Sequence, residues 1–284
     1  MMCHVWSPFR YQQLRETRSI FSGFGNLLPT QTSNNYSMPH PLQVTHSNNV
    51  VTAVVNRPEA MNAVNFELMD RLEELIDQFS SDSQTRLFIL TGSGNSFISG
   101  GDLREFHQLK TADEARQMTR RMLRLLDRIR QLPFWTLAAL NGATYGGGWE
   151  IAAVFDFRIA KRGIKIGFTQ GKFYLPPGWG GVASLTRLVS KQKALYWLAS
   201  QRVISADEAH QAGFVDDLCD TDSYNDSLSA IIKRLTRNDR TFIEYLKSSA
   251  HFSSPNEEVE PFSTFWESEE HQERVQDFLD RKKS

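Results

Sequence analysis

The chain of 284 residues lacks three features that would assign it to whole classes of protein. It has only two cysteines, Cys3 and Cys219, so neither a disulfide framework nor a cysteine-rich metal site is indicated, which favours a reducing compartment. It has no run of about 18 consecutive apolar residues, so we expect no transmembrane helix. Lys and Arg total 32 against 33 Asp and Glu, so nucleic acid and anionic membranes are not expected as partners. An anionic ligand would have to be bound by local groups.

The first forty residues differ from the rest in composition. They are rich in Ser, Thr, Asn and Gln, and Arg10, Arg15 and Arg18 outnumber the single Glu16. We expect residues 1–40 to form a flexible extension, with a start of translation at Met38 or a transit peptide as the alternatives. The expected location is therefore the cytoplasm, or the mitochondrion if the segment is a transit peptide.

Apolar periodicity predicts alternating strands and helices over the next part of the chain. Residues 50–55 are short and β-branched and predict a strand, whereas residues 66–79 have apolar side chains at helical spacing. Residues 87–90 predict the next strand, and the order strand, helix, strand indicates a parallel sheet covered by helices. Further expected elements are a long helix ending before Pro133, strands at 136–140 and 157–160, a helix with Ser205 as its N-cap, and a C-terminal helix over 260–283.

Two glycine clusters follow predicted strands and could bind a negatively charged oxygen. Gly146-Gly147-Gly148 lies where a helix is expected to begin, so its N–H groups lack intrahelical acceptors. Gly100-Gly101 offers a second backbone donor without a side chain to block approach. Two such donors on one carbonyl oxygen would form an oxyanion hole, worth about 3 to 4 kcal/mol per donor. The alternative is that both clusters are only tight turns, since their spacing is not that of a dinucleotide-binding loop.

Together these motifs resemble the enoyl-CoA hydratase/isomerase family, or crotonase superfamily. The resemblance runs in order from about Leu42 to Lys283. Its motifs are Asn56-Arg57-Pro58-Glu59-Ala60-Met61-Asn62-Ala63, Ser99-Gly100-Gly101-Asp102-Leu103, Asn141-Gly142, Gly146-Gly147-Gly148-Trp149-Glu150, Pro177-Gly178-Trp179-Gly180-Gly181, Thr186-Arg187-Leu188 and Ser205-Ala206-Asp207-Glu208-Ala209 with Gly213.

The resemblance implies an α/β fold, a crotonase-like spiral of ββα units with two roughly perpendicular sheets and a helical C-terminal region. The spiral core would cover residues 41–200, and residues 201–284 would form a helical region for trimerisation. The resemblance also implies an acyl-CoA thioester as the substrate and a homotrimer or dimer of trimers. No metal and no separate cofactor are expected, because coenzyme A enters as part of the substrate.

The resemblance also assigns roles to residues of this chain. It implies that the thioester oxygen lies between the N–H groups of Gly101 and Gly147. Trp179 could either form a wall of the acyl pocket, which its position in a loop favours, or fill core. Coenzyme A would lie across two loops, at Glu59, Ala60, Asn62, Ser99, Gly100, Asp102, Leu103 and Arg104.

The hydratases of the family use two glutamates, and only one has a counterpart here. The first maps onto Glu150. Counting back from Pro177 without a gap places Gln170 at the second position, and an alignment with deletions would place Lys172 there; neither is a glutamate. Glu150 could alternatively be an acidic residue that satisfies N–H groups of its own helix, and Gln170 could be a structural amide.

The missing carboxylate affects the expected reaction. Hydration needs a base and an acid, and an amide cannot transfer a proton at neutral pH, so hydratase and isomerase activities should suffer. Decarboxylation of a malonyl-type thioester needs no base, and there Gln170 could orient the substrate carboxylate while Glu150 donates a proton or positions a group. Trp179 and Asp156-Phe157-Arg158 resemble the family's decarboxylases of branched malonyl-CoA derivatives. Hydration through Glu150 alone, thioester hydrolysis and a degenerate CoA-binding module remain as alternatives.

Overall fold

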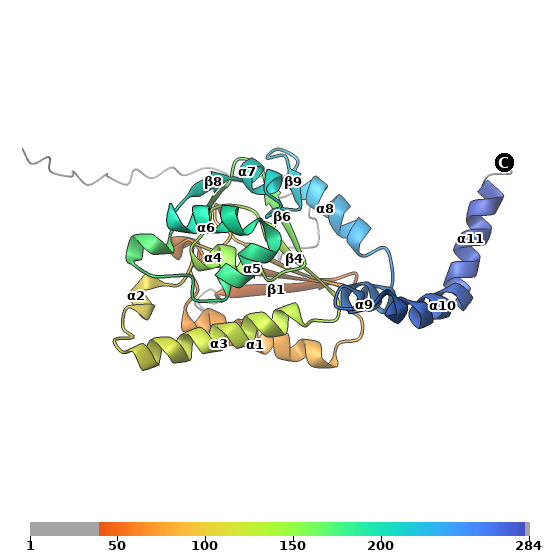
Figure 1. Ribbon diagram of the computed structural model, residues 1–284, viewed down its shortest axis with the longest axis horizontal. Helices are drawn as coiled ribbons and strands as arrows, with labels where there is room; N and C mark the ends of the chain where they lie inside the picture. The colour runs from red at the N-terminus through yellow and green to blue at the C-terminus, as the bar shows by residue number, and fades with distance from the viewer. Residues whose placement is uncertain (1–39, 282–284) are drawn as a thin grey trace, which may run out of the picture.

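A computed structural model describes residues 40–281 of the chain. A six-stranded sheet runs through its body (Figure 1). In spatial order its strands are β1 (Leu42–Ser47), β2 (Val50–Val55), β3 (Leu87–Gly92), β4 (Trp135–Leu140), β6 (Phe157–Lys161) and β9 (Asp217–Cys219). β1 pairs antiparallel with β2, and every following pair is parallel. The predicted parallel sheet is therefore confirmed, with one antiparallel strand at its edge. The prediction for residues 1–40 concerns a segment that lies outside the described residues, except for His40.

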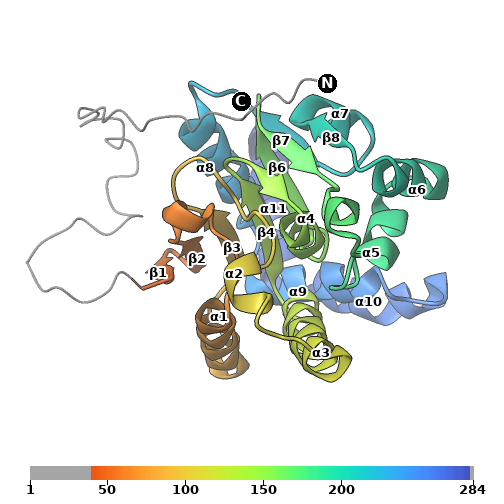
Figure 2. The ribbon, with the colours of Figure 1, turned by 90° about the vertical axis from the view of Figure 1, so that its left-hand side faces the viewer.

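The two faces of this sheet are covered by different helices, because side chains alternate along each strand. Phe88 and Leu90 of β3 lie in one core cluster with the buried stripes of α1 (Phe66–Gln78) and α3 (Ala112–Arg130). Leu87 and Ile89 lie in a second cluster with α8 (Tyr224–Leu235). Figure 2 shows α1 and α3 side by side below the sheet and α8 on the opposite side.

A second, smaller sheet carries the remaining short elements. It has the order β5 (Thr144–Tyr145), β7 (Lys165–Gly167) and β8 (Val203–Ser205). Around it lie the helical segments α4 (Gly147–Ala152), η3 (Gln170–Phe173), α5 (Gly181–Leu188), α6 (Lys191–Ala199) and α7 (Ala206–Gln211). The Ser205 side chain accepts a hydrogen bond from the N–H of Glu208, which confirms the predicted N-cap.

The C-terminal region extends away from this body (Figure 1). It consists of α9 (Arg240–Ser249), η4 (Pro255–Glu258), α10 (Val259–Glu267) and α11 (Glu269–Arg281). The single helix predicted over 260–283 is wrong in one respect, because extended backbone at Ser268 divides it in two. No residue of α10 or α11 is buried, so their apolar side chains contribute nothing to the core of the described chain.

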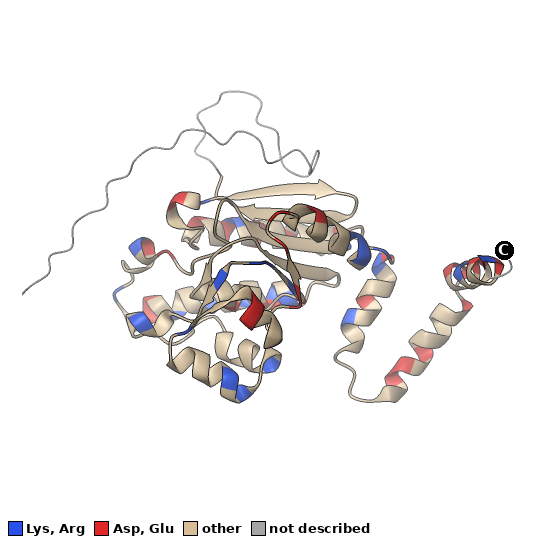
Figure 3. Ribbon diagram, turned by 90° about the horizontal axis from the view of Figure 1, so that it is seen from above, with Lys and Arg blue, Asp and Glu red and all other residues tan. Residues whose placement is uncertain are grey.

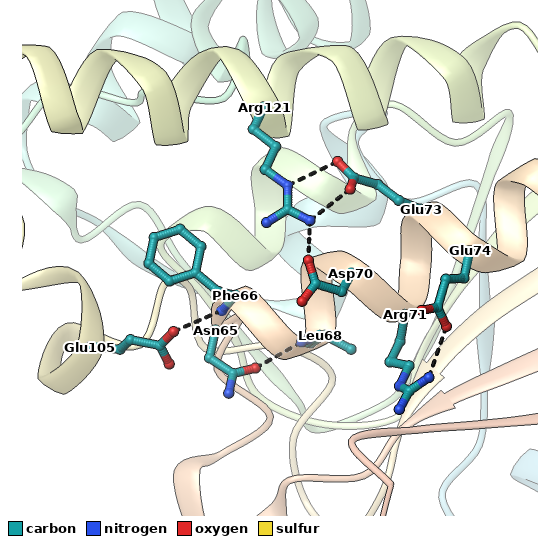
Figure 4. Close-up of polar contacts among 9 residues, drawn as sticks. All are labelled: Asn65, Phe66, Leu68, Asp70, Arg71, Glu73, Glu74, Glu105 and Arg121. Atoms are coloured by element: carbon teal, nitrogen blue, oxygen red, sulfur yellow. Dashed lines mark hydrogen bonds and ion pairs between the residues drawn. The ribbon is translucent and has the colours of Figure 1, made fainter.

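Charged residues of both signs are spread over the described ribbon (Figure 3). Two arginines of α3 pair with acidic residues of α1. Arg121 forms ion pairs with Asp70 and Glu73, as Figure 4 shows, and Arg128 pairs with Asp77. These pairs lie at the surface and contribute little individually. They explain Arg121 and Arg128 as helix–helix contacts.

Candidate active site

The first glycine turn directs the N–H of Gly101 away from its neighbouring backbone. Val64 donates its N–H to the carbonyl oxygen of Gly100 at 2.8 Å and accepts from the N–H of Asp102 at 2.7 Å. In such a parallel bridge the N–H of the middle residue, Gly101, points to the opposite side. Gly100 has a φ of 114°, which a residue with a Cβ rarely adopts. No described residue accepts a hydrogen bond from the Gly101 N–H.

The second glycine turn brings the N–H of Gly147 next to the first. Gly146 has a φ of 51° and donates its N–H to the carbonyl oxygen of Gly167 at 3.0 Å. Gly147 then begins α4, so its N–H has no intrahelical acceptor. A Cβ on Gly100 would lie 3.2 Å from the nitrogen of Gly147, so the two turns are in contact. A Cβ on Gly148 would lie only 1.9 Å from the carbonyl oxygen of Ile98, so only glycine lets α4 begin this close to the loop before Ser99.

Two aromatic rings lie against these glycines. A Cβ on Gly147 would be 2.1 Å from Cζ3 of Trp179, and one on Gly101 would be 3.6 Å from Cη2 of the same indole. The ring of Phe106, at the end of α2 (Leu103–Phe106), lies on Gly101 from another direction, 2.6 Å from the position of its missing Cβ. Trp179 is 6% exposed, so its indole is enclosed between the two turns and the core.

Glu150 is the buried carboxylate of this site. It is 2% exposed and lies on α4, three residues after Gly147. Its Oε2 accepts hydrogen bonds from the N–H groups of Trp179 at 2.8 Å and Gly181 at 2.9 Å. Burial raises the pKa of the Glu150 carboxyl, while these hydrogen bonds and one from Gln170 oppose the rise. Glu150 accepts no hydrogen bond from its own helix α4, but it does satisfy an unpaired N–H group at a helix start, because Gly181 is the first residue of α5. Glu150 holds the loop that carries Trp179.

Gln170 is hydrogen-bonded at both ends of its amide. Its Nε2 donates to Oε1 of Glu150 at 2.9 Å, and its Oε1 accepts from Nε1 of Trp149 at 3.1 Å. An indole nitrogen can only donate, so Trp149 determines which end of the amide faces Glu150. Trp149 itself is fully buried.

A network around Arg57 fixes the loop before Gly101. The Arg57 guanidinium donates to Asp102 at 2.8 Å and also bonds the carbonyl oxygen of Ala63. Asp102 caps α2 by accepting from the N–H of Arg104 at 3.0 Å. Glu105 accepts from the N–H of Phe66 at 3.1 Å and ties α2 to the start of α1 (Figure 4). Asp102 is thus placed as a support of the Gly101 turn.

The residues expected to contact coenzyme A are divided between surface and interior. Glu59, Leu103 and Arg104 are exposed, and Leu103 reaches 52% exposure. Ala60 and Ser99 are partly buried and face each other, with the Ser99 hydroxyl 3.4 Å from the carbonyl oxygen of Ala60.

Asn62 belongs to the interior group. It is 0% exposed, and its side-chain nitrogen donates to the carbonyl oxygens of Ser93 and Ser96 at 2.9 and 2.8 Å. Asn62 therefore shapes the loop between η1 (Pro58–Ala60) and α1, and its side chain is not available to a ligand.

Other ligand-binding features lie elsewhere or are not found among residues 40–281. No group of three or more His, Cys, Asp or Glu side chains in this range could hold a metal ion. A groove of about 690 Å³ lies between β9 and α8, on the far side of the sheet from α1 and α3, and shares no lining residue with the glycine turns. No helix among the described residues has the length and apolarity needed to cross a membrane.

Solved structures identify the class of fold. The structure superimposes on an enoyl-CoA hydratase from Bacillus anthracis with a TM-score of 0.77 and 25% identity, over 85% of this chain and 96% of that one. It matches an enoyl-CoA hydratase/carnitine racemase from Magnetospirillum magneticum with the same TM-score and 26% identity, over 86% and 94% of the two chains. The predicted crotonase-like α/β fold is therefore confirmed.

The chain belongs to the enoyl-CoA hydratase/isomerase family, whose model matches residues 45–284. A relative named crotonyl-CoA hydratase, from Syntrophomonas wolfei, is 30% identical over 81% of this chain and 91% of its own length. A second, named ethylmalonyl-CoA decarboxylase, from Xenopus tropicalis, is 31% identical over 60% of this chain and 57% of its own length. The family contains enzymes of both kinds, so membership does not select the reaction.

Three residues of the site were not identified from the sequence: Arg57 as a clamp, Phe106 beneath Gly101, and Trp149 as a donor to Gln170. The only available signal was for Arg57, which lies in a motif shared with the family. Phe106 and the Trp149 indole reach the site through tertiary packing between distant segments, which no local pattern in the sequence encodes.

Proposed function

We propose that this chain acts on an acyl-CoA thioester and stabilises its enolate by hydrogen bonds from the N–H groups of Gly101 and Gly147. The proposal is supported by two contacting turns whose amides have no acceptor among the described residues, and by the family relationship. Each donor aimed at a developing oxyanion is worth about 3 to 4 kcal/mol. Coenzyme A would lie over the exposed residues Glu59, Leu103 and Arg104, and the enzyme would assemble as a trimer or pair of trimers through its C-terminal region.

We further propose that the reaction is decarboxylation of a malonyl-type thioester. The observation that carries this step is Gln170, an amide at the second carboxylate position, which is committed to Glu150 and Trp149. In the step, the bond between the α-carbon and the substrate carboxylate breaks and carbon dioxide leaves. The electron pair forms the enolate, whose oxygen is held by the two amides. A proton from water or from Glu150 then returns to the α-carbon, so no initial base is required.

Hydration is the second candidate, and Glu150 favours it. Burial raises the pKa of this carboxyl, and groups with shifted pKa values are the usual acids and bases of active sites. A relative that covers most of the chain is named crotonyl-CoA hydratase. Against hydration, Oε2 of Glu150 already accepts two backbone N–H groups and Oε1 accepts from Gln170.

A substrate panel separates the two reactions. Crotonyl-, ethylmalonyl-, methylmalonyl- and methylglutaconyl-CoA are incubated with the enzyme and the products are measured by mass spectrometry. The proposal expects loss of carbon dioxide from the malonyl compounds and slow turnover of crotonyl-CoA. Rapid hydration of crotonyl-CoA with no decarboxylation would overturn it in favour of the second candidate. Binding without consumption of any thioester would indicate a degenerate family member.

A further inference from the structure

We infer that the indole of Trp179 sets an upper limit on the size of the acyl group, so that the substrates are short-chain thioesters. This inference rests on the proposed function, because it assumes that the thioester oxygen binds between Gly101 and Gly147. It adds an upper limit on the length of the acyl chain and names the residue that sets this limit.

The position of the indole relative to both glycines carries the inference. A Cβ on Gly147 would lie 2.1, 2.5 and 2.9 Å from Cζ3, Cε3 and Cη2 of the ring, so the six-membered ring lies directly on the α-carbon of Gly147. Cη2 is also the indole atom nearest to Gly101, 3.6 Å from the position of its missing Cβ. One edge of one ring therefore touches both turns.

The ring is held firmly in this place. The N–H groups of Trp179 and Gly181 both donate to Oε2 of Glu150, which fixes the loop on either side of Gly180. The indole is 6% exposed and belongs to the main core cluster, so it cannot rotate away without displacing its neighbours. Binding of a long acyl chain would require that displacement and would therefore be weaker.

An acyl group bound through its oxygen to the two amides begins within a few ångströms of this ring. The ring of Phe106 lies near the same place, 2.6 Å from the position of the missing Cβ of Gly101, so two rings pack against this turn. A short chain can lie beside the indole edge, whereas each additional methylene must find room against packed rings. In a hydrophobic pocket, one methylene group too many changes the preference of an enzyme between two substrates by roughly 10- to 200-fold.

The test uses thioesters that cannot be hydrated or decarboxylated, so that binding is measured apart from chemistry. Butyryl-, octanoyl- and dodecanoyl-CoA are titrated calorimetrically into the wild-type chain, Trp179→Leu and Trp179→Phe. Leucine keeps the backbone N–H that bonds Glu150 and removes the ring. Tyr196→Leu, an exposed aromatic residue on α6, is the matched control, and thermal unfolding verifies that each variant is folded.

The affinity of the wild type for butyryl-CoA should be at least about tenfold higher than its affinity for octanoyl-CoA. Trp179→Leu should reduce that ratio by roughly tenfold or more, Trp179→Phe should lie between, and Tyr196→Leu should match the wild type. If the wild type binds all three chain lengths equally, or if both Trp179 variants keep the wild-type ratio, the inference is wrong while the proposed function survives. If no thioester binds to the wild type, the proposed function fails as well.

Discussion

Nε2 of Gln170 donates a hydrogen bond to Oε1 of Glu150 at 2.9 Å. The amide cannot turn over to reverse this contact without losing the bond between its Oε1 and the Trp149 indole. Glu150 and Gln170 therefore form a carboxylate–amide pair with a fixed orientation. The amide favours the ionised form of Glu150, while burial favours the neutral form.

Gln170→Glu should shift the enzyme towards hydration. The new carboxyl group would lie within hydrogen-bonding distance of the Glu150 carboxyl, and two carboxyl groups this close cannot both be ionised. One of them therefore keeps its proton near neutral pH and can act as the acid that hydration needs. Because acid–base groups are commonly worth roughly 10²- to 10⁴-fold, we expect crotonyl-CoA hydration to rise at least roughly tenfold. The rate is followed by loss of the conjugated thioester absorbance. Gln78→Glu, at the exposed end of α1, should leave the rate unchanged; no gain in Gln170→Glu would argue against the assignment of the second position.

Trp149 and Glu150 should be energetically coupled through Gln170. In Glu150→Gln, the new side-chain NH₂ group faces Nε2 of Gln170, and the Trp149 indole prevents Gln170 from turning over. Trp149→Phe removes that restraint. Trp149→Phe should therefore destabilise the Glu150→Gln background less than the wild type, by about 1 kcal/mol. A double-mutant cycle in urea measures this difference, and strict additivity would refute the orientation of the amide.

The Glu150 carboxyl should make the free energy of unfolding depend on pH. Because the pKa of Glu150 is raised above its ordinary value of 4.5, the folded state binds more protons than the unfolded state between the two pKa values. The contribution of Glu150 to stability is thus fully present below pH 4.5 and falls as pH rises through the folded pKa. The unfolding free energy of the wild type minus that of Glu150→Gln should decline with pH in this window. A difference that increases with pH would mean a lowered pKa.

Gly147→Ala should nearly abolish activity while the chain remains folded. The added methyl group would lie 2.1 Å from Cζ3 of Trp179, so the indole or the turn must move and the amide loses its alignment. Loss of one oxyanion donor predicts a fall in kcat of roughly 10²- to 10³-fold. Gly163→Ala is the control: its methyl meets nothing within 4 Å, but its φ of 82° is strained for alanine, so it should lose stability and keep kcat. Equal activities of the two variants would exclude a role for the Gly147 amide.

Together with Ile243 and Arg240, Lys247 should contribute to the attachment of α9 to the core. Its Nζ donates to Asp156 at 2.7 Å and to the carbonyl oxygen of Phe134 at 3.1 Å, and burial lowers the pKa of this ammonium. Lys247→Met removes the ammonium from the Asp156 carboxylate, which keeps its hydrogen bonds from Thr136, and should cost up to about 3 kcal/mol. The double variant with Asp156→Asn removes that charge and should recover part of the loss. Urea denaturation measures both, and a double variant as unstable as the single one would contradict the explanation.

Most of the large sheet could be predicted from local patterns. The strands at 50–55, 87–92 and 135–140 are short apolar runs, and α1 and α3 carry clear apolar stripes, so periodicity was sufficient. The three-residue strands β7, β8 and β9 were not predicted, because segments this short have no detectable period and form only when the rest of the sheet provides partners.

The candidate site was predictable in its residue types but not in its contacts. The glycine motifs and Glu150 could be selected because their residue types fit an anion-binding turn and an acid. The bonds from Trp179, Gly181 and Gln170 to Glu150 join segments 20 to 31 residues apart. Such contacts are determined by packing of whole elements, so a sequence pattern around Glu150 does not contain them.

The absence of buried side chains from α10 and α11 has a consequence for how the polypeptide could be shortened. The last side chain of α9 to be fully enclosed is that of Ile243, and Lys247 follows one turn later. The hydrophobic interior is therefore complete before Ser249. A protease that cuts the backbone near Ser253 would leave the glycine turns, the indole of Trp179 and the whole large sheet in one intact piece, to which Phe265 of α10 would be attached through its ring contacts with Phe242 and Tyr245.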